Sequence, residues 1–235
     1  MHPSSIYAYL EKPSMVDFPG KFAAVFFTSG CNFMCGFCHN ASLMGRKRPG
    51  INWEAMELAC RKFKTHWVNG AVITGGEPTL ADDLPELIEL MKRHGFSVKL
   101  DTNGSNPGKL REVLPLVDYV AMDVKTGLSD YDRLVQFPNL SNISESIELI
   151  KAQAKDYEFR TTVIETWHTD ELMDEVAEII DGSKRFALQA FIPRDNLPDK
   201  KFTLLPRTPP PASTNSRTGW PAAPTKSSCA GRKAG

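Results

Sequence analysis

The sequence predicts an α/β fold, a (βα)6 partial barrel of the TIM type, from three observations. Short runs rich in β-branched and aromatic residues alternate with stretches of helical periodicity, as in βα units that repeat around a parallel sheet. The 235 residues, of which 41% are hydrophobic, suffice for one domain of this size. The composition changes abruptly after Pro206, which marks the expected end of that domain.

The expected strands are short apolar runs bounded by turn residues. In chain order they are Phe22 to Thr28, Ala71 to Thr74, Ser97 to Asp101, Tyr119 to Asp123, Phe159 to Ile164 and Phe186 to Phe191. Crossovers between parallel strands are right-handed, so the units should curl into a full or partial barrel. The active site of such a barrel lies at the carboxyl ends of its strands.

The expected helices between these strands carry apolar residues on one face. The stripes are Met56, Ala59, Cys60, Phe63 and Trp67; Leu84, Leu87, Ile88 and Met91; Ile143, Ile147, Ile150 and Ala154; and Leu172, Met173, Val176 and Ile180. Asp82 or Asp83 should cap the second helix, Gly95 should end it, and Thr169 should cap the fourth.

The predicted domain spans residues 1–206, and residues 207–235 form a tail of different composition. The tail contains no Ile, Leu, Val, Phe, Asp or Glu, but it has five prolines and five basic residues. Because such a segment cannot build a core, we expect it to be disordered.

Charge and hydropathy exclude several classes of partner. The 28 Lys and Arg balance 28 Asp and Glu, so no basic excess predicts binding to nucleic acid or to an anionic membrane. No apolar run is long enough to span a bilayer, and the N-terminus lacks the features of a signal peptide. We therefore expect a cytoplasmic protein without a nucleic-acid or membrane partner.

Three cysteines follow the first predicted strand with the spacing Cys31-x-x-x-Cys35-x-x-Cys38. Cysteine thiolates hold iron-sulfur clusters, and three thiolates on a 4Fe-4S cluster leave one iron open for another ligand. The alternative is a zinc site, which needs a fourth ligand; His39 adjoins Cys38 and would have difficulty reaching the same ion. Cys60, on a helix face, and Cys229, in the tail, are not expected to be ligands.

The loop GCNFMCGFCHN resembles the cluster loop of the radical S-adenosylmethionine (SAM) superfamily, including an aromatic residue, Phe37, before the last cysteine. The resemblance implies a barrel of the radical SAM type over residues 1–206 and a 4Fe-4S cluster held by Cys31, Cys35 and Cys38. The open iron would bind SAM, and reductive cleavage would give methionine and a 5′-deoxyadenosyl radical.

The segment Thr74-Gly75-Gly76-Glu77-Pro78 matches the GGEP motif with which this superfamily binds the amino group of SAM. The chemistry agrees, because two glycines allow backbone to approach a ligand closely, and carbonyls and a carboxylate are suitable acceptors for an ammonium. A tight turn that leads into a helix is the alternative interpretation.

Two further strand ends resemble segments of the glycyl-radical-enzyme activating enzymes that lie beside the SAM carboxylate and ribose. They are Asp101-Thr102-Asn103-Gly104 and Asp123-Val124-Lys125. By this resemblance Lys125 would pair with the carboxylate, while Asp101, Thr102 and Asp123 could hold a monovalent cation. Arg160 resembles another SAM-contacting position, and Gln189 lies where the sixth strand closes the site. A turn and a surface salt bridge would be the alternative.

Within that branch, three segments resemble the proteins that activate anaerobic ribonucleoside-triphosphate reductase: Met15 to Lys21, Cys38-His39-Asn40 and Tyr119 to Lys125. Such an enzyme takes a hydrogen atom from a glycine of its partner, a glycyl radical enzyme, and receives electrons from flavodoxin or ferredoxin. Three alternatives stay open: a small-molecule enzyme similar to 7-carboxy-7-deazaguanine synthase, an activase of the pyruvate formate-lyase type, and a non-catalytic metal protein.

Overall fold

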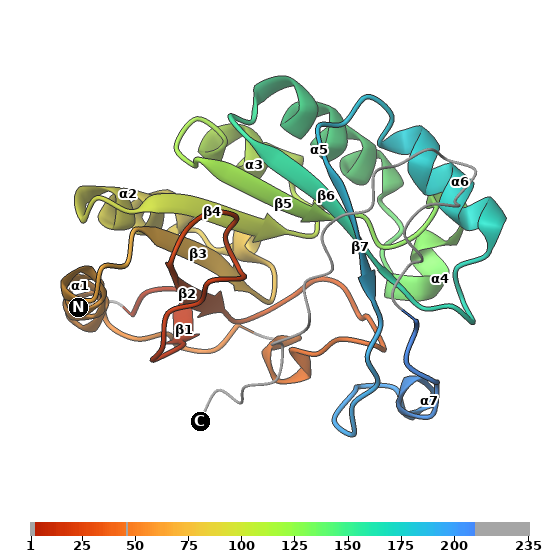
Figure 1. The fold of residues 1–235 in the computed structure, drawn as a ribbon, viewed down its shortest axis with the longest axis horizontal. Coiled ribbons are helices and arrows are strands. Elements are labelled where there is room, and N and C mark those ends of the chain that lie inside the picture. The colour runs from red at the N-terminus through yellow and green to blue at the C-terminus, as the bar shows by residue number, and fades with distance from the viewer. Residues whose placement is uncertain (1–2, 46, 210–235) are drawn as a thin grey trace.

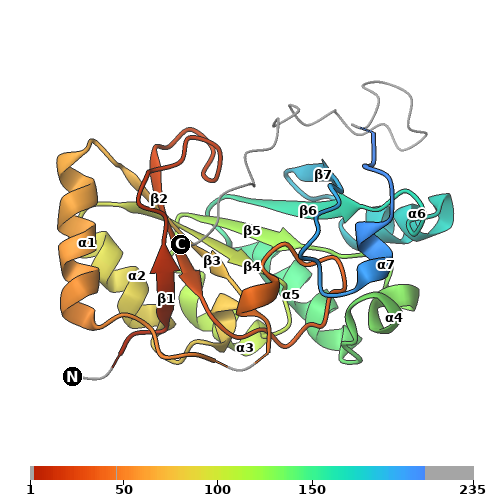
Figure 2. The same cartoon turned by 90° about the horizontal axis from the view of Figure 1, so that it is seen from below.

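A single seven-stranded sheet organises the computed structural model, which describes residues 3–45 and 47–209. Its strands follow one another in chain order across the sheet (Figures 1 and 2). They are β1 (Ile6–Tyr9), β2 (Ala23–Thr28), β3 (Gly70–Gly75), β4 (Ser97–Thr102), β5 (Tyr119–Asp123), β6 (Tyr157–Val163) and β7 (Phe186–Ala190). Only the β1–β2 pair is antiparallel, and each later pair is parallel.

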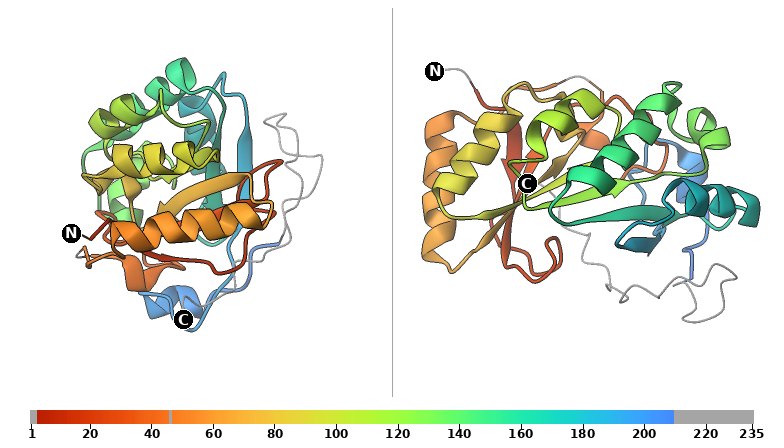
Figure 3. Two further views of the ribbon diagram at one scale, coloured as in Figure 1. Left: turned by 90° about the vertical axis from the view of Figure 1, so that its left-hand side faces the viewer. Right: turned by 90° about the horizontal axis from the view of Figure 1, so that it is seen from above.

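Helices follow each of the parallel strands. They are α1 (Trp53–Thr65), α2 (Leu84–Arg93), α3 (Pro107–Val113), α4 (Tyr131–Val135), α5 (Leu140–Gln153), α6 (Asp170–Ile179) and α7 (Lys200–Thr203), with short 3-10 turns at Ala41–Leu43, Pro78–Leu80 and Leu128–Asp130. Helices α1, α2, α3 and α5 lie along one face of the curved sheet (Figure 3). Strands β1 and β7 end the sheet without pairing to each other, which confirms the predicted α/β partial barrel.

The six predicted strands lie within two residues of their expected bounds, but β1 was not predicted. β1 is only four residues long, and of its side chains only Ile6 is buried. Such a short edge strand has too few residues for a clear alternation of apolar and polar positions. Its pairing with β2 therefore becomes visible only in the folded protein.

Most side chains of the helical stripes are buried, but Ala154, Leu172 and Met173 are half-buried and Trp67 is exposed. The first helix ends at Thr65, and Trp67 adopts a left-handed backbone conformation with φ of 62° and is 90% exposed. This conformation turns Trp67 away from the face that carries Met56 and Phe63, so its predicted burial was wrong. Thr169 caps α6 as expected. Asp83 also stands at the predicted N-cap position of α2, but its carboxylate accepts a hydrogen bond from Ser5 N and makes no capping hydrogen bond.

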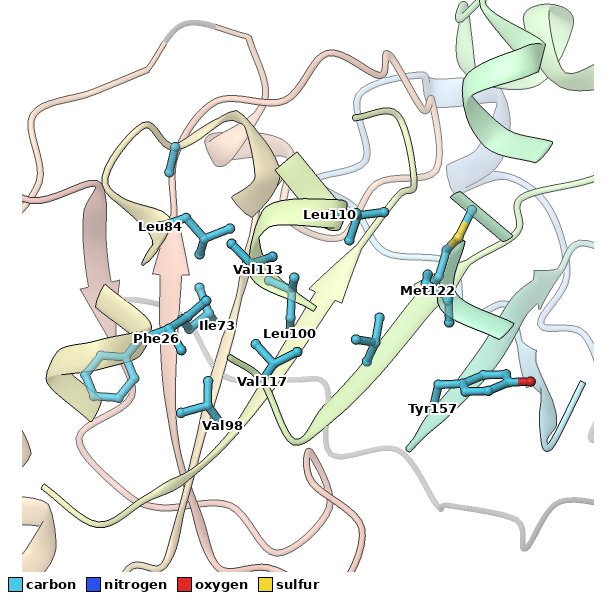
Figure 4. Packing of buried hydrophobic residues seen from close by; sticks show 14 of the residues in the cluster. Phe26, Ile73, Leu84, Val98, Leu100, Leu110, Val113, Val117, Met122 and Tyr157 are labelled. Atoms are coloured by element: carbon cyan, nitrogen blue, oxygen red, sulfur yellow. The ribbon is translucent and has the colours of Figure 1, made fainter. Parts of the chain in front are cut away.

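The core has two parts because neighbouring residues of a strand face opposite sides of the sheet. The larger part fills the space between the sheet and the helices, and Figure 4 shows Phe26, Ile73, Leu100 and Met122 within it. The smaller part lies on the concave face and contains Phe18, Ala23, Val25, Val72, Tyr119 and Ala121. Along β5 the concave face thus changes from the apolar Tyr119 and Ala121 to Asp123 at the carboxyl end.

The last described residues are attached to the barrel. Thr208 N donates a hydrogen bond to Phe191 O at 3.0 Å, and its hydroxyl donates to Val163 O at 2.8 Å. These contacts are made by a residue beyond the predicted boundary after Pro206. The disorder expected beyond it concerns mainly residues 210–235, which lie outside the described residues, as does Cys229. Over the described part of the chain, no helix is both long and apolar enough to cross a membrane.

Candidate functional site

A cavity of about 2490 Å³ lies within the curve of the sheet. Its lining contains every residue that the sequence predicted for the site: Cys31, Cys35, Phe37, Cys38, Gly75, Gly76, Glu77, Asp101, Thr102, Asn103, Asp123, Lys125, Arg160 and Gln189. The parallel strands end at the same edge of the sheet, so their loops converge although they are far apart in the sequence.

The three cysteines lie in the loop after β2 as free thiols, and Cys35 is buried. Burial raises the pKa of Cys31 to about 11 and that of Cys35 to about 12, and it also raises the pKa of Cys38. Their thiolates therefore need a positively charged partner at neutral pH, such as a metal centre. Cys31 Sγ accepts hydrogen bonds from Phe33 N at 3.4 Å and from Asn103 Nδ2 at 3.8 Å.

The geometry of the described residues does not provide a tight site for one metal ion. Nowhere in residues 3–45 and 47–209 do three or more His, Cys, Asp or Glu side chains gather as a single ion requires. His39, the fourth ligand considered for zinc, has its Nε2 at 2.8 Å from Ile192 O. A structural zinc ion would need four ligands converging as a tetrahedron.

The cysteine loop is covered by the segment that contains α7 (Figure 2). Asp199 N donates a hydrogen bond to Gly36 O at 3.1 Å, and a side chain at Gly36 would come within 2.7 Å of the Phe202 ring. The Phe37 ring packs against Phe202 at 5.7 Å between centroids. Phe37 is thus a buried anchor of the loop, and glycine at position 36 allows α7 to approach closely.

The two glycines of the GGEP segment pack against the cysteine loop. Gly76 N donates a hydrogen bond to Thr28 O at 3.0 Å, and Glu77 N donates to Gly30 O at 2.8 Å. Gly75 has φ of 118°, which favours glycine, and a Cβ at Gly76 would lie 2.0 Å from Gly30 O. The glycines therefore allow two loops of the site to meet backbone to backbone.

The Glu77 side chain joins the loops after β3 and β4. Its Oε1 accepts hydrogen bonds from Thr79 N at 2.9 Å, Thr79 Oγ1 at 2.6 Å and Thr102 Oγ1 at 2.8 Å. Its Oε2 accepts from Asn103 N at 2.6 Å. Burial raises the pKa of Glu77, while these hydrogen bonds oppose the change. The sequence predicted carbonyls of this segment and the Glu77 carboxylate as acceptors for a ligand ammonium; in the structure the carboxylate accepts from four protein donors.

Five charged side chains form a continuous ion-pair row across β4, β5 and β6: Lys99, Asp101, Arg160, Asp123 and Lys125. Lys99 Nζ lies 2.5 Å from Asp101 Oδ1, and Arg160 Nη1 lies 3.5 Å from the same oxygen. Arg160 Nε then donates to Asp123 Oδ1 at 2.8 Å, and Lys125 Nζ donates to Asp123 Oδ2 at 3.0 Å. The row thus links β4 to the segment after β5.

The charges of the row keep its aspartates ionised. Burial alone would raise the pKa of Asp123, but Arg160 and Lys125 outweigh it and lower that pKa. For Asp101, burial is likewise outweighed by Arg160 and Lys99, and the pKa is lowered. Lys125 stands at the end of the row near the cysteines, since its charge lowers the pKa of all three thiols. A cation placed there can bind a carboxylate ligand.

The three groups predicted to hold a monovalent cation do not converge. The Thr102 hydroxyl donates to Glu77 and accepts a hydrogen bond from Gly104 N at 3.1 Å. Consecutive residues of a strand point to opposite faces, so Thr102 lies across the sheet from the Asp101 carboxylate. Asp101 and Asp123 are paired with Lys99, Arg160 and Lys125 instead.

Sequence reasoning missed Lys99 and the residues that hold the backbone of Lys125. Lys99 could have been found, because it is two residues before Asp101 on the same strand face. His168 Nε2 donates to Lys125 O at 2.8 Å, and Lys125 N donates to the Tyr131 hydroxyl at 3.1 Å. His168 carries no recognisable motif in the sequence. Gln189, which was predicted, is exposed and its Oε1 lies 3.5 Å from Thr162 Oγ1.

Comparisons with known proteins agree with this geometry. The family model described as Radical SAM superfamily matches residues 25–181. Protein MJ1227 of Methanocaldococcus jannaschii, provisionally named as a glycyl-radical enzyme activating enzyme, is 33% identical over 201 residues, which cover 82% of each chain. The 7-carboxy-7-deazaguanine synthase of Neisseria meningitidis is 34% identical over 103 residues, 43% of each chain.

The fold has a counterpart among solved structures. SuiB of Streptococcus suis, in a crystal structure bound to S-adenosylmethionine, aligns with a TM-score of 0.61 at 18% identity. The alignment covers 74% of this chain and 41% of SuiB. At this identity the likeness concerns the fold.

Proposed function

Because this chain belongs to the radical SAM superfamily, we propose that it is a glycyl-radical-enzyme activating enzyme. In this reaction it would take a hydrogen atom from a backbone glycine of a partner protein. The observation that carries the proposal is the 33% identity to MJ1227 over 82% of both chains, since the match extends well beyond the cysteine loop.

The cofactors of the family are a 4Fe-4S cluster and SAM, and the residues present fit both. Three thiols come from one loop, an amide N–H of Asn103 points at Cys31 Sγ, and Lys125 provides a cation beside them. Cys31, Cys35 and Cys38 would hold the cluster, and Lys125 would hold the SAM carboxylate. When bound, the reduced cluster would supply the electron for cleavage of SAM into methionine and a 5′-deoxyadenosyl radical.

The amino end of SAM would meet the GGEP segment. Glu77 is occupied by its own donors, so it acts on this region by holding Thr79, Thr102 and Asn103 in place. Backbone carbonyls of that loop are the acceptors that suit an ammonium. Asp101, Asp123 and Arg160 would orient Lys125 through the ion-pair row.

The proposed partner is a glycyl radical enzyme, most specifically anaerobic ribonucleoside-triphosphate reductase, with flavodoxin or ferredoxin as electron donor. The segments Met15 to Lys21 and Cys38-His39-Asn40 support this choice through their resemblance to activators of that reductase. A cavity of about 2490 Å³ exceeds the 300–1,000 Å³ or so that is usual for small ligands, and it would leave room for a glycine-bearing loop.

The decisive experiment mixes the cluster-loaded protein with SAM, dithionite and the cognate reductase without oxygen. We expect the electron spin resonance doublet of a glycyl radical on the partner. Cys35→Ala should abolish iron binding and the doublet, whereas Cys60→Ala, which removes a buried thiol outside the loop, should keep both. SAM cleavage without spin on any partner glycine, together with consumption of a small metabolite, would refute the activase proposal.

That outcome would favour the second candidate, an enzyme similar to 7-carboxy-7-deazaguanine synthase, which the 34% identity over 103 residues supports. The same assay with pyruvate formate-lyase in place of the reductase tests the remaining alternative, an activase of the pyruvate formate-lyase type. The histidine that such activases carry near the end of the last strand is absent from residues 186–192 of this sequence. If the chain is specific for the reductase, we expect no glycyl radical on pyruvate formate-lyase.

A further inference from the structure

Lys99 is a buried lysine that has no part in the proposed binding of the cluster or of SAM. It lies on β4, and only 2% of its surface is exposed. Its ammonium is 2.5 Å from Asp101 Oδ1, an oxygen that Arg160 Nη1 also approaches at 3.5 Å. A buried ammonium is costly unless it is paired, and here Asp101 is the partner that allows Lys99 to be buried beside the ligand-binding cavity.

The position of Lys99 relates it to the cation that the sequence predicted. Asp101 and Asp123 are the two carboxylates of that predicted site, and the Thr102 hydroxyl that should complete it is bound to Glu77. Lys99 lies two residues before Asp101 on the same face of β4, and its ammonium donates a hydrogen bond to the Asp101 carboxylate. The ammonium thus lies beside one of the two carboxylates of the predicted cation site. An ammonium carries the same single positive charge as Na⁺ or K⁺, and it is tethered to the protein.

We propose that the Lys99 ammonium is a built-in counter-charge that replaces a bound monovalent cation at the SAM site. Lys99 pairs with Asp101, which lies beside Arg160. Arg160 in turn pairs with Asp123. Asp123 pairs with Lys125, the residue that would meet the SAM carboxylate. Lys99 is thus a positioning residue, and SAM binding is independent of Na⁺ and K⁺. The inference depends on SAM binding, which the family shows, and is separate from the activase proposal.

Replacement of Lys99 by methionine tests this directly, because methionine keeps most of the apolar stem and removes the ammonium. Asp101 would then have Arg160 as its one remaining cation in the row, and a space the size of an ammonium would open beside a buried carboxylate. Free K⁺ or NH₄⁺ could enter that space and restore the charge. A variant that lost only packing would not respond to the choice of cation.

The measurement is the equilibrium dissociation constant of SAM for the cluster-loaded protein, in potassium, ammonium or choline chloride at equal ionic strength. We expect the wild-type constant to be the same in all three salts. In choline, Lys99→Met should bind SAM at least about tenfold more weakly, as expected when a charge-assisted contact in a closed site is lost. Potassium or ammonium should recover most of this loss.

Lys92→Met is the matched control. Lys92 also pairs with an aspartate, Asp118, but this pair lies outside the ion-pair row. Its removal should change neither the SAM affinity nor the response to the cation. The cluster-free proteins provide a second readout: potassium should raise the melting temperature of Lys99→Met relative to choline, and should leave that of the wild type unchanged.

Two outcomes overturn the proposal. One is a wild-type SAM affinity that falls when potassium and sodium are replaced by choline, which would mean that the site needs a bound cation. The other is a Lys99→Met protein that binds SAM as tightly as the wild type in every salt. If Lys99→Met does not fold, the wild-type salt series still decides, because cation dependence refutes the inference and independence supports it.

Discussion

At the residue scale, Glu77 shows how a motif residue can serve the site without facing the ligand. Each carboxylate oxygen of Glu77 accepts a hydrogen bond from a backbone N–H, Oε1 from Thr79 and Oε2 from Asn103. Backbone donors cannot rotate as hydroxyls can, so both oxygens must be acceptors. This requirement favours the ionised carboxylate although burial raises its pKa.

Glu77→Gln should therefore destabilise the protein although the two side chains have nearly the same shape. In either orientation the glutamine NH₂ would meet a backbone N–H and leave it unsatisfied, which costs about 1–3 kcal/mol. Urea unfolding of the cluster-free protein measures this loss. Glu89→Gln, at an exposed position on α2, is the control, and its effect should be much smaller. Equal effects of both substitutions would show that Glu77 is already neutral.

At the scale of elements, α7 acts as a cover for the cysteine loop although it is only four residues long. Phe202 is buried, and its ring contacts those of Phe37, Trp167 and Phe191. Phe37 belongs to the cysteine loop and Phe191 directly follows β7. The aromatic cluster thus holds the loop after the first parallel strand against the end of the last one.

Phe202→Ala should loosen this cover. We expect a loss of about 3 kcal/mol in unfolding free energy, as is usual when a buried phenylalanine is truncated. The cluster-loaded variant should also lose iron to a chelator faster than the wild type, followed by the decay of its visible absorbance. Leu204→Ala serves as control, because Leu204 follows the same helix and is 86% exposed. The same chelation rate in both variants would contradict a covering role for α7.

At the scale of the whole molecule, the concave face of the sheet combines a small apolar core with a buried ion-pair row. Removal of one partner from a buried ion pair is strongly destabilising, because the other charge stays buried without compensation. The row spans three strands through Asp101 on β4, Asp123 on β5 and Arg160 on β6. Protonation of the two aspartates in this row therefore affects the stability of the whole sheet.

The lowered pKa values of Asp101 and Asp123 predict a loss of stability in acid. Their contribution is complete above the pKa of an aspartate in the unfolded chain, about 3.9, and is lost as the pH falls through the lower folded-state pKa. Unfolding of the cluster-free protein at a series of acidic pH values measures this slope, and Asp101→Asn should flatten it. A stability that does not change over this range would contradict the prediction.

The sequence by itself determined the features that depend on local patterns. The alternation of strands and helices and the spacing of Cys31, Cys35 and Cys38 are readable within short windows, because periodicity and metal-ligand chemistry act over a few residues. The polar residues at strand ends were also predictable, since the carboxyl ends of parallel strands meet at one edge of a sheet. All of them line the same cavity.

Only the tertiary structure decided what those residues do there. Glu77 is bound by Asn103, 26 positions later, and Gly36 is covered by Asp199 and Phe202 from the far end of the barrel. Asp101 on β4 gains Arg160 from β6 as a partner, and Thr102 is directed to Glu77 instead of to a cation. These contacts join residues far apart in the sequence, and their partners follow from packing and from the register of the strands, which local patterns do not specify.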